Sequence, residues 1–165
     1  MAECKLVSIP METGCKLIKN DDSPSINQTL YRSMIGIFLY LTTSRPNIMQ
    51  EISMVSRFQY DTMQYYHNAM HRILKYIQGT LDYGLWYPHK NDFTLSSYTN
   101  ADWGGSDDKK STNGASFFLG ECLVSWDCKK QDCVTLSTCE SKYFTATTCC
   151  YQLIWMNYQL SDLGI

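Results

Sequence analysis

Cysteine thiols offer the widest choice of chemistry in this sequence, because a thiol can form a disulfide, bind zinc or act as a nucleophile. The chain of 165 residues contains eight cysteines. Four of them form a loose cluster, namely Cys122, Cys128, Cys133 and Cys139. Structural zinc sites commonly contain a C-x-x-C pair, and this cluster has none, so its spacing argues against structural zinc.

A cysteine nucleophile needs a general base, which is usually a histidine. The three histidines are His67, His71 and His89, and no cysteine lies in a recognised nucleophile context. Adjacent Cys149 and Cys150 point to different sides of a predicted helix, which indicates packing residues. The sequence therefore does not favour a cysteine enzyme.

The first ten residues contain no apolar run of signal-peptide length. We therefore expect an intracellular protein, cytoplasmic or nuclear and not secreted, whose thiols stay free in a reducing environment. No stretch reaches the ~20 apolar residues that span a bilayer, so no membrane is expected as a partner. No small-molecule substrate is indicated either.

The formal net charge of −2 excludes a protein that coats nucleic acid non-specifically, because that task needs a surplus of lysine and arginine. Any contact with nucleic acid must be local. The candidate basic residues are His71, Arg72, Lys75, Lys109, Lys110, Lys129 and Lys130. Each of these groups is interpreted first as part of a solvated face.

Residues 1–26 show little periodicity and contain Pro10, Gly14 and Pro24, so they are predicted to form an extended tether that builds no core. A helical subdomain is predicted over 27–88. Its first helix is predicted to have Asn27 as its N-cap, and its second helix is predicted to carry Pro46 in the first turn. Its third stops at Gly79, predicted as a left-handed C-cap. The apolar positions that define these helices are Leu30, Met34, Ile37, Phe38 and Leu41, then Ile48 or Met49, Ile52, Val55 and Phe58 or Gln59, then Met70, Ile73, Leu74 and Ile77.

After Gly79 the residue types become typical of strands. A short strand is predicted at 83–87, a strand with one buried face at 93–99, and a hairpin from 116–119 and 122–126 around Gly120-Glu121. A long helix follows from Ser137 to Leu163. The predicted fold class is α/β in the broad sense (α+β), with a helical subdomain, then a three-stranded antiparallel sheet and a long helix.

Three groups of residues occur in a fixed order along the chain. The first comprises Tyr31-Arg32-Ser33-Met34-Ile35-Gly36, Leu39-Tyr40-Leu41-Thr42 and Ser44-Arg45-Pro46. The second comprises Arg72-Ile73-Leu74-Lys75-Tyr76-Ile77 and Gly79-Thr80-Leu81-Asp82-Tyr83-Gly84-Leu85. The third comprises Ala101-Asp102-Trp103, Lys110-Ser111-Thr112, Ser125-Trp126, Lys129-Lys130-Gln131 and Leu136-Ser137-Thr138. This ordered set resembles the Pol polyproteins of copia-type retrotransposons, especially those of flowering plants.

The resemblance implies that residues 27–88 correspond to the region that connects reverse transcriptase to RNase H. Residues 89–165 would then be a truncated RNase H-like domain. The family hydrolyses RNA in RNA/DNA hybrids with Mg²⁺ ions held by carboxylates, since Mg²⁺ prefers oxygen ligands. The implied partners are an RNA/DNA hybrid and another Pol chain.

The family's carboxylate positions are replaced in this sequence. The first-strand aspartate falls on Asn100 and the helix glutamate on Lys142, and a third aspartate is expected beyond Ile165. A neutral amide is a weak Mg²⁺ ligand. A lysine ~4 Å from Mg²⁺ would cost ~8 kcal/mol at an effective dielectric constant of ~20. We therefore expect a catalytically inactive copy that does not bind Mg²⁺.

Two residual acids lie near these positions. Glu140 is roughly 200° around the helix from Lys142, so it cannot replace the lost ligand directly. It has S-x-x-E spacing from Ser137, which favours a capping box at the helix start. Asp102 shares a face with Asn100 only if the strand continues past 99, and the two would then form a vestigial metal position.

Three hypotheses remain. The first is an inactive remnant that at most binds nucleic acid weakly. The second is a domesticated interaction module, in which the open sheet edge left by truncation recruits another chain by strand addition. The third is a working nuclease that uses Asp102, Glu140 and an acid from a partner.

Overall fold

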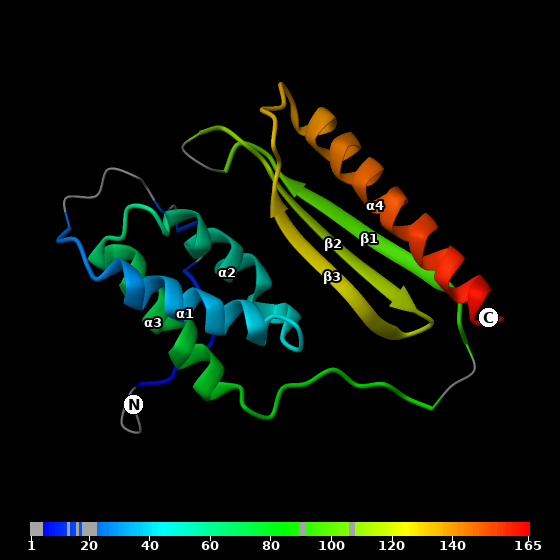
Figure 1. Ribbon diagram of the computed structural model, residues 1–165, viewed down its shortest axis with the longest axis horizontal. Helices are drawn as coiled ribbons and strands as arrows, with labels where there is room; N and C mark the ends of the chain where they lie inside the picture. Colours follow the sequence, from blue (N-terminus) through cyan, green and yellow to red (C-terminus); the bar gives the residue numbers. More distant parts are fainter. Residues whose placement is uncertain (1–4, 13, 16, 18–22, 90–91, 106–107) are drawn as a thin grey trace. The chain divides into compact units, whose positions relative to one another are not determined.

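The structure is a computed structural model that describes residues 5–12, 14, 15, 17, 23–89, 92–105 and 108–165 (Figure 1). The chain forms two compact units, Met1–Gly84 and Leu85–Ile165, which we describe separately. The first is helical, and the second combines an antiparallel sheet with a long helix. The predicted fold class, a helical region followed by a partial sheet and a long helix, is confirmed.

The helices of the first unit occur where the apolar spacing predicted them, but the buried face of the first helix was predicted wrongly. Leu30 and Ile37 are 52% and 60% exposed, whereas Tyr31 and Ile35 are buried with Phe38. The helices are α1 (Gln28–Leu41), η1 (Pro46–Ile48), α2 (Met49–Val55), η2 (Ser56–Phe58) and α3 (Gln64–Gly79). The Asn27 side chain caps α1 by accepting hydrogen bonds from the backbone N–H groups of Thr29 and Leu30. Pro46 occupies the first turn of η1, which leads directly into α2, so the predicted helix start is confirmed.

The core cluster of the first unit is apolar and almost entirely removed from solvent, and the unit also buries Thr42, Thr62 and Thr80. The buried side chains of the core cluster are Leu17, Tyr31, Ile35, Phe38, Ile48, Ile52, Val55, Tyr66, Met70, Ile73 and Tyr76. Apart from Leu17, they project from α1, from η1 and α2, and from α3 at three- and four-residue spacing. The stacked rings of Phe58 and Tyr66, with centroids 4.0 Å apart, extend this core.

The N-terminal segment contributes to this core, so the prediction that residues 1–26 build no core was wrong. Leu17 is 7% exposed, and Val7, Met11 and Ile26 pack against the buried cluster. A bridge between Ser25 and Met63 ties the end of this segment to the start of α3. These apolar residues lack a helical or strand period, which is why the pattern did not reveal their burial.

Two local predictions after α3 were also wrong. Gly79 is the last residue of α3 rather than a left-handed cap, and the C-cap is Thr80, whose φ is −133°. The Thr80 hydroxyl donates to the carbonyl of Tyr76, which satisfies one of the free helix-end acceptors. Residues 83–87 form no strand, although Tyr and Trp are typical strand residues.

The sheet of the second unit contains β1 (Leu95–Asp102), β2 (Thr112–Leu119) and β3 (Cys122–Lys130) in that order. Both pairs are antiparallel, and a register shift occurs between Phe117 and Phe118. The predicted hairpin is present between β2 and β3. Gly120 lies in its turn with φ +59°, a conformation that favours glycine. The first strand runs three residues further than the predicted 93–99.

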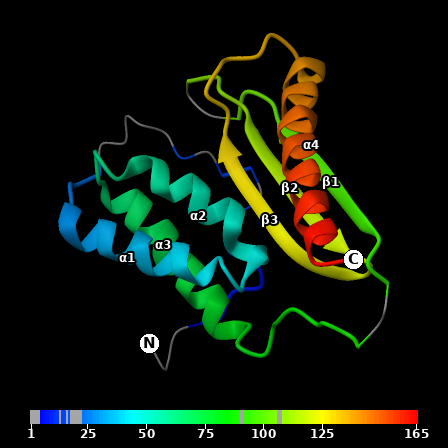
Figure 2. The same ribbon diagram turned by 45° about the vertical axis from the view of Figure 1, so that its right-hand side comes forward.

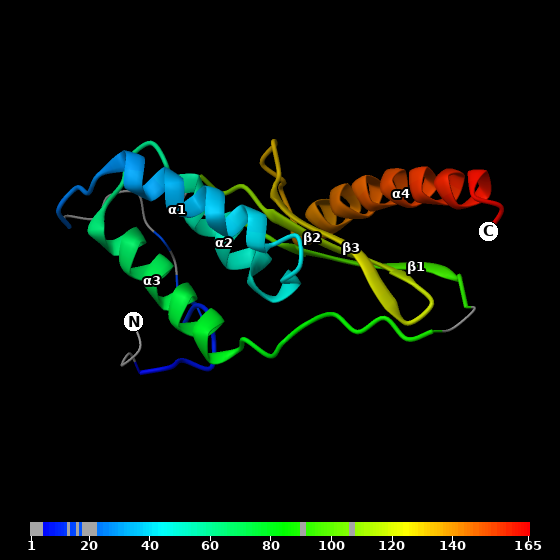
Figure 3. The same cartoon turned by 60° about the horizontal axis from the view of Figure 1, so that its bottom comes forward.

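The long helix α4 (Thr138–Asp162) packs mainly over β1 (Figure 2). The turned view in Figure 3 shows α4 on one side of the sheet. Cys149 of α4 is buried and donates to the Ser97 hydroxyl of β1 at 3.3 Å. Across the part of the chain that the structure describes, none of the helices combines the length and hydropathy needed to span a membrane.

Candidate functional site

The candidate site begins at the end of β1, where Asn100 and Asp102 lie two residues apart. Asn100 pairs with Gly114 and Asp102 with Thr112, so the strand continues through both residues. Side chains two residues apart on a strand share a face, so Asn100 and Asp102 project from the same side of the sheet. Both are exposed to solvent.

The face that carries these two side chains is opposite the face covered by α4. Ser97 of β1 contacts Cys149 of α4, and Asn113, the partner of Ala101, accepts a hydrogen bond from Thr145 of α4 at 2.6 Å. Positions 97 and 101 therefore face the helix. Alternation along the strand places positions 100 and 102 on the other side.

A tight turn follows Asp102. Gly104 has φ +64°, and a Cβ atom on Gly105 would collide with the Asp102 carboxylate. The carboxylate therefore lies against the backbone of the turn. The indole N–H of Trp103 donates to the Thr135 carbonyl at 3.0 Å, which fixes the chain where it leaves the sheet.

Glu140 is engaged at the start of α4. The Ser137 hydroxyl accepts from the Glu140 backbone N–H at 3.1 Å, as expected for an N-cap. The Glu140 carboxylate accepts from the Leu136 backbone N–H at 2.6 Å, one residue before the donor of a standard capping box. Its carboxylate thus serves the helix end.

Lys142 lies on the first turns of α4 and is exposed to solvent. Its neighbour Ser141 is fully buried, so Lys142 is turned about 100° away from the residue that enters the interior. The structure therefore places the four predicted site residues on two elements. Asn100 and Asp102 share a strand face, and Glu140 and Lys142 leave α4 in different directions.

This set of donors does not fit a Mg²⁺ site. Mg²⁺ needs several oxygen ligands, preferably carboxylates, in near-octahedral geometry. Asn100 supplies a neutral amide and Lys142 a cation, and Glu140 already holds a backbone N–H. Within the described residues, no three His, Cys, Asp or Glu side chains come together as a possible metal site.

A buried polar network joins the sheet to α4, and sequence reasoning missed it. The Gln131 side chain is 2% exposed, and its amide donates to Asn113 Oδ1 at 2.6 Å and to the Ser141 carbonyl at 3.1 Å. Thr145 donates to the same Asn113 oxygen. Nothing in the periodicity distinguished Gln131, since glutamine is usually exposed.

The basic residues of the loop before β2 and of the end of β3 are partly neutralised. Lys130 forms an ion pair with Asp108. Desolvation tends to raise the pKa of Asp108, but the hydrogen bond and charge of Lys130, together with Lys110, hold that pKa below its ordinary value. Lys130 is therefore occupied by an internal carboxylate, whereas Lys109 and Lys129 are exposed.

Together, the elements define a mixed α/β protein, with a helical unit followed by a unit in which a long helix packs on an antiparallel sheet. No protein-family model matches the chain, and no solved structure matches it.

Three known proteins are similar to this chain in sequence. The chain is 34% identical over its whole length to the retrovirus-related Pol polyprotein from transposon RE2 of Arabidopsis thaliana, of which it covers 11%. It is 32% identical over its whole length to the one from transposon TNT 1-94 of Nicotiana tabacum, of which it covers 13%. Over 76% of the chain it is 33% identical to the secreted RxLR effector protein 161 of Plasmopara viticola, of which it covers 90%.

The chain belongs to the copia-type retrotransposon Pol polyprotein family, in its plant-like branch. It spans 11% to 13% of the length of the Pol polyproteins described above.

Proposed function

We propose that residues 89–165 are an RNase H-like remnant of a Pol polyprotein that no longer hydrolyses RNA in RNA/DNA hybrids. The Pol relatives support the lineage. The order strand, hairpin and long helix, with the Ala101-Asp102-Trp103 and Lys129-Lys130-Gln131 motifs, supports the RNase H-like assignment. The proposal depends most on the resemblance of the motifs, which assigns Asn100 and Lys142 to the family's carboxylate positions.

The chemistry of these two residues opposes a metal-dependent reaction. An RNase H reaction relies on metal ions to activate water and to stabilise the leaving oxygen, so its ligands must be anionic. Asn100 removes one negative charge, and Lys142 replaces another with a positive one. Lys142 is exposed and could swing away from a bound cation, but it would still supply no ligand.

The arrangement of the elements supports the same proposal. Asp102 projects from the sheet face opposite α4, and its carboxylate lies against the turn at Gly105. Glu140 is held by the Leu136 N–H. The hypothesis of a working nuclease would require both acids to leave these positions, and it is therefore the weaker one.

A cleavage assay on the full chain tests this proposal. A labelled RNA/DNA hybrid is titrated with Mg²⁺ in the presence of wild type and of the double variant Asn100→Asp/Lys142→Glu. We expect no Mg²⁺-dependent cleavage by wild type, and little by the double variant, because the restored carboxylates leave β1 and α4 in different directions. Cleavage by wild type that depends on Asp102 would overturn the proposal.

Residual nucleic-acid binding should be weak and sensitive to salt. Among the exposed lysines of the second unit, Lys109 and Lys129 are available to phosphates. Lys130, by contrast, is paired with Asp108. Each phosphate contact contributes about 0.9 to the slope of log affinity against log salt. We expect Lys129→Gln to lower the slope for a hybrid by about that amount, measured by fluorescence anisotropy, whereas Glu121→Gln should leave it unchanged.

A second candidate function, a domesticated protein-interaction module, is favoured by the position of β1 at the edge of the described sheet. An edge strand offers backbone groups to which another chain can add a strand. The relative from Plasmopara viticola, which the chain covers to 90%, is named a secreted effector rather than a Pol polyprotein.

Substitutions on the two sheet edges test this second function. Thr99→Lys introduces a charge on the edge strand β1, and Val124→Lys does the same on β3. A defined complex, with a second copy or another Pol chain, should be lost with Thr99→Lys and kept with Val124→Lys in sedimentation velocity. Equal behaviour of the two variants would argue against recruitment at β1.

A further inference from the structure

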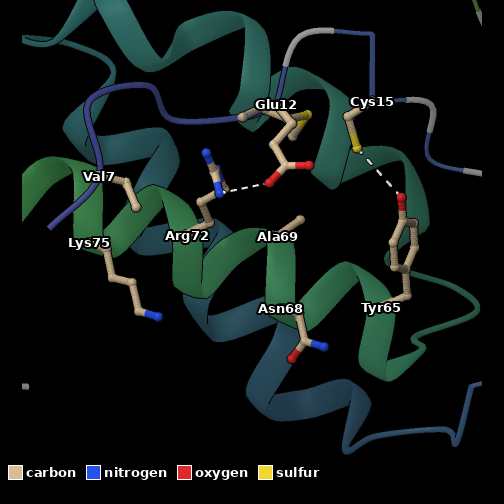
Figure 4. Close-up of a pocket in the computed structure, with 9 residues that line it drawn as sticks. Val7, Glu12, Cys15, Tyr65, Asn68, Ala69, Arg72 and Lys75 are labelled. Atoms are coloured by element: carbon tan, nitrogen blue, oxygen red, sulfur yellow. Dashed lines mark hydrogen bonds and ion pairs between the residues drawn. The ribbon is translucent and has the colours of Figure 1, made fainter. Parts of the chain in front are cut away.

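A concave site lies in the first unit, far in sequence from the RNase H-like residues. The segment before α1 crosses α3 and forms with it an open cavity of about 390 Å³ (Figure 4). Residues of the segment form one wall, namely Val7, Met11, Glu12 and Cys15. Residues of α3 form the other wall, namely Tyr65, Asn68, Ala69, Arg72 and Lys75. Small-molecule pockets begin at about 300 Å³, so this cavity suits a small ligand.

The cavity has a cationic side. Arg72 and Lys75 both line it, against the single carboxylate of Glu12. Arg72 Nη1 donates to Glu12 Oε1 at 3.0 Å, as Figure 4 shows. Arg72 Nε is buried and has no acceptor among the described residues. A guanidinium presents several donors in a planar fork, so Arg72 still has donors for a second acceptor.

The Glu12–Arg72 pair is easy to displace. The Glu12 side chain is 72% exposed and the Arg72 side chain 30% exposed. Ion pairs of this kind contribute little net stability, because water solvates the separated charges almost as well. A stronger acceptor that reaches the terminal nitrogens of Arg72 would therefore replace the Glu12 carboxylate at small cost.

The rest of the wall is apolar. Val7, Met11 and Ala69 supply aliphatic surface, and Tyr65 supplies a ring. The Tyr65 hydroxyl lies 3.5 Å from the Cys15 thiol, which ties the segment to α3 at this end of the cavity (Figure 4). A ligand that matches both sides has an apolar body and an anionic group at one end.

We propose that this cavity binds a small organic anion, an apolar ring or chain that ends in a phosphate or carboxylate, and that its acidic group replaces Glu12 on Arg72. The apolar body lies against Val7, Met11 and Tyr65. Lys75, one turn further along α3, adds a second positive charge. This site is separate from the RNase H-like residues and does not depend on the function proposed for them.

Titration of the full chain with three probes tests the proposal. Phenyl phosphate carries both features, benzoate exchanges phosphate for carboxylate, and inorganic phosphate lacks the apolar body. We expect phenyl phosphate or benzoate to shift the amide NMR signals of 64–76 and of the described residues of 5–15. Inorganic phosphate should bind at least about tenfold more weakly. The tighter of the two organic probes identifies the acidic group. Failure of both to bind overturns the proposal.

Variants of the paired charges sharpen the test. Arg72→Gln should weaken the better probe by about tenfold or more, because a charge-assisted bidentate contact is lost. Glu12→Gln should tighten it, because the internal competitor is removed. Arg32→Gln, which removes an exposed cation from α1 of the same unit, should leave it unchanged. If Arg72→Gln fails to fold, two other variants still test the proposal. Lys75→Gln should weaken binding of the probe, because a positive charge is lost, whereas Glu12→Gln should tighten it. An unchanged affinity in Glu12→Gln, or an equal loss in Arg32→Gln, overturns the proposal.

Discussion

The two units differ in what they bury. The first unit buries mostly aliphatic and aromatic side chains, from its helices and from Leu17 of the N-terminal segment, together with the three threonines Thr42, Thr62 and Thr80. The second buries mostly polar groups between its sheet and α4, namely Ser111, Gln131, Thr135, Ser141 and Thr145, beside the apolar Phe117 and Cys149. The interior of the first unit is held by desolvation, and that of the second by directed hydrogen bonds.

This difference predicts how each interior responds to substitution. Apolar burial is non-directional, so its cost of disruption follows the volume that is removed. A polar network depends on each partner, because a buried group that loses its partner keeps its full desolvation cost. The first unit should therefore be sensitive to cavities and the second to the loss of single hydrogen bonds.

The largest expected effect is a cavity in the first unit. Phe38 is 1% exposed and lies on α1 among the buried residues, so Phe38→Ala should lower the free energy of unfolding by about 3–5 kcal/mol. Hydrogen exchange of the α1–α3 amides measures this, because all four tryptophans lie in the second unit. The control Leu39→Ala removes a side chain that is 46% exposed and should cost less than about 1 kcal/mol.

Loss of one amide should have the next largest effect. Gln131→Leu keeps a similar volume but removes the donor to Asn113 and Ser141, so we expect a loss of about 1–3 kcal/mol in the second unit. The same substitution also removes Gln131 Oε1, which is buried without a partner among the described residues. Because removal of this oxygen is favourable, we expect the loss to lie in the lower part of the range. Urea unfolding followed by tryptophan fluorescence measures the change.

The exposed Gln159 of α4 supplies the matched control for this variant. Gln159→Leu makes the same chemical change at the surface and should alter stability by less than about 0.5 kcal/mol. If Gln131→Leu proves as stable as wild type, the contrast between the two interiors loses its energetic basis.

The sequence predicted the elements whose residues repeat with a regular period. Ile52 and Val55, with either Ile48 or Met49, were predicted on one helix face, and Ile48, Ile52 and Val55 are fully buried. The hairpin at Gly120 and the cap at Ser137 were also predicted, because turn and cap chemistry is local. Such features need no knowledge of the rest of the fold.

Burial that depends on distant contacts was missed. Leu17 enters the core without any periodic neighbour, and Gln131 becomes buried only because α4 brings Ser141 and Thr145 onto it. The face of Asn100 depended on how far β1 extends, which the residue types after 99 did not indicate. The candidate site was therefore identified by motif, and its orientation required the structure.

The smallest effect concerns one polar group in the first interior. The fully buried Tyr31 hydroxyl donates to the Val55 carbonyl at 2.7 Å, so Tyr31→Phe should cost about 1 kcal/mol at pH 8. Burial raises the pKa of Tyr31, and the nearby Tyr66 raises it further. The folded state thus keeps the proton that an unfolded tyrosine loses near pH ~10.

The stability that Tyr31 contributes is therefore complete below that pH and is lost as pH rises toward its raised folded pKa. The difference in free energy of unfolding between wild type and Tyr31→Phe should shrink or reverse between pH 8 and pH 11. Hydrogen exchange at the two pH values, corrected for the intrinsic exchange rate, measures it. Tyr40→Phe on the same helix, where the ring is 78% exposed, should show no such change. A pH-independent difference for Tyr31→Phe would mean that its hydroxyl reaches water, and that the first interior is less thoroughly desolvated than its packing indicates.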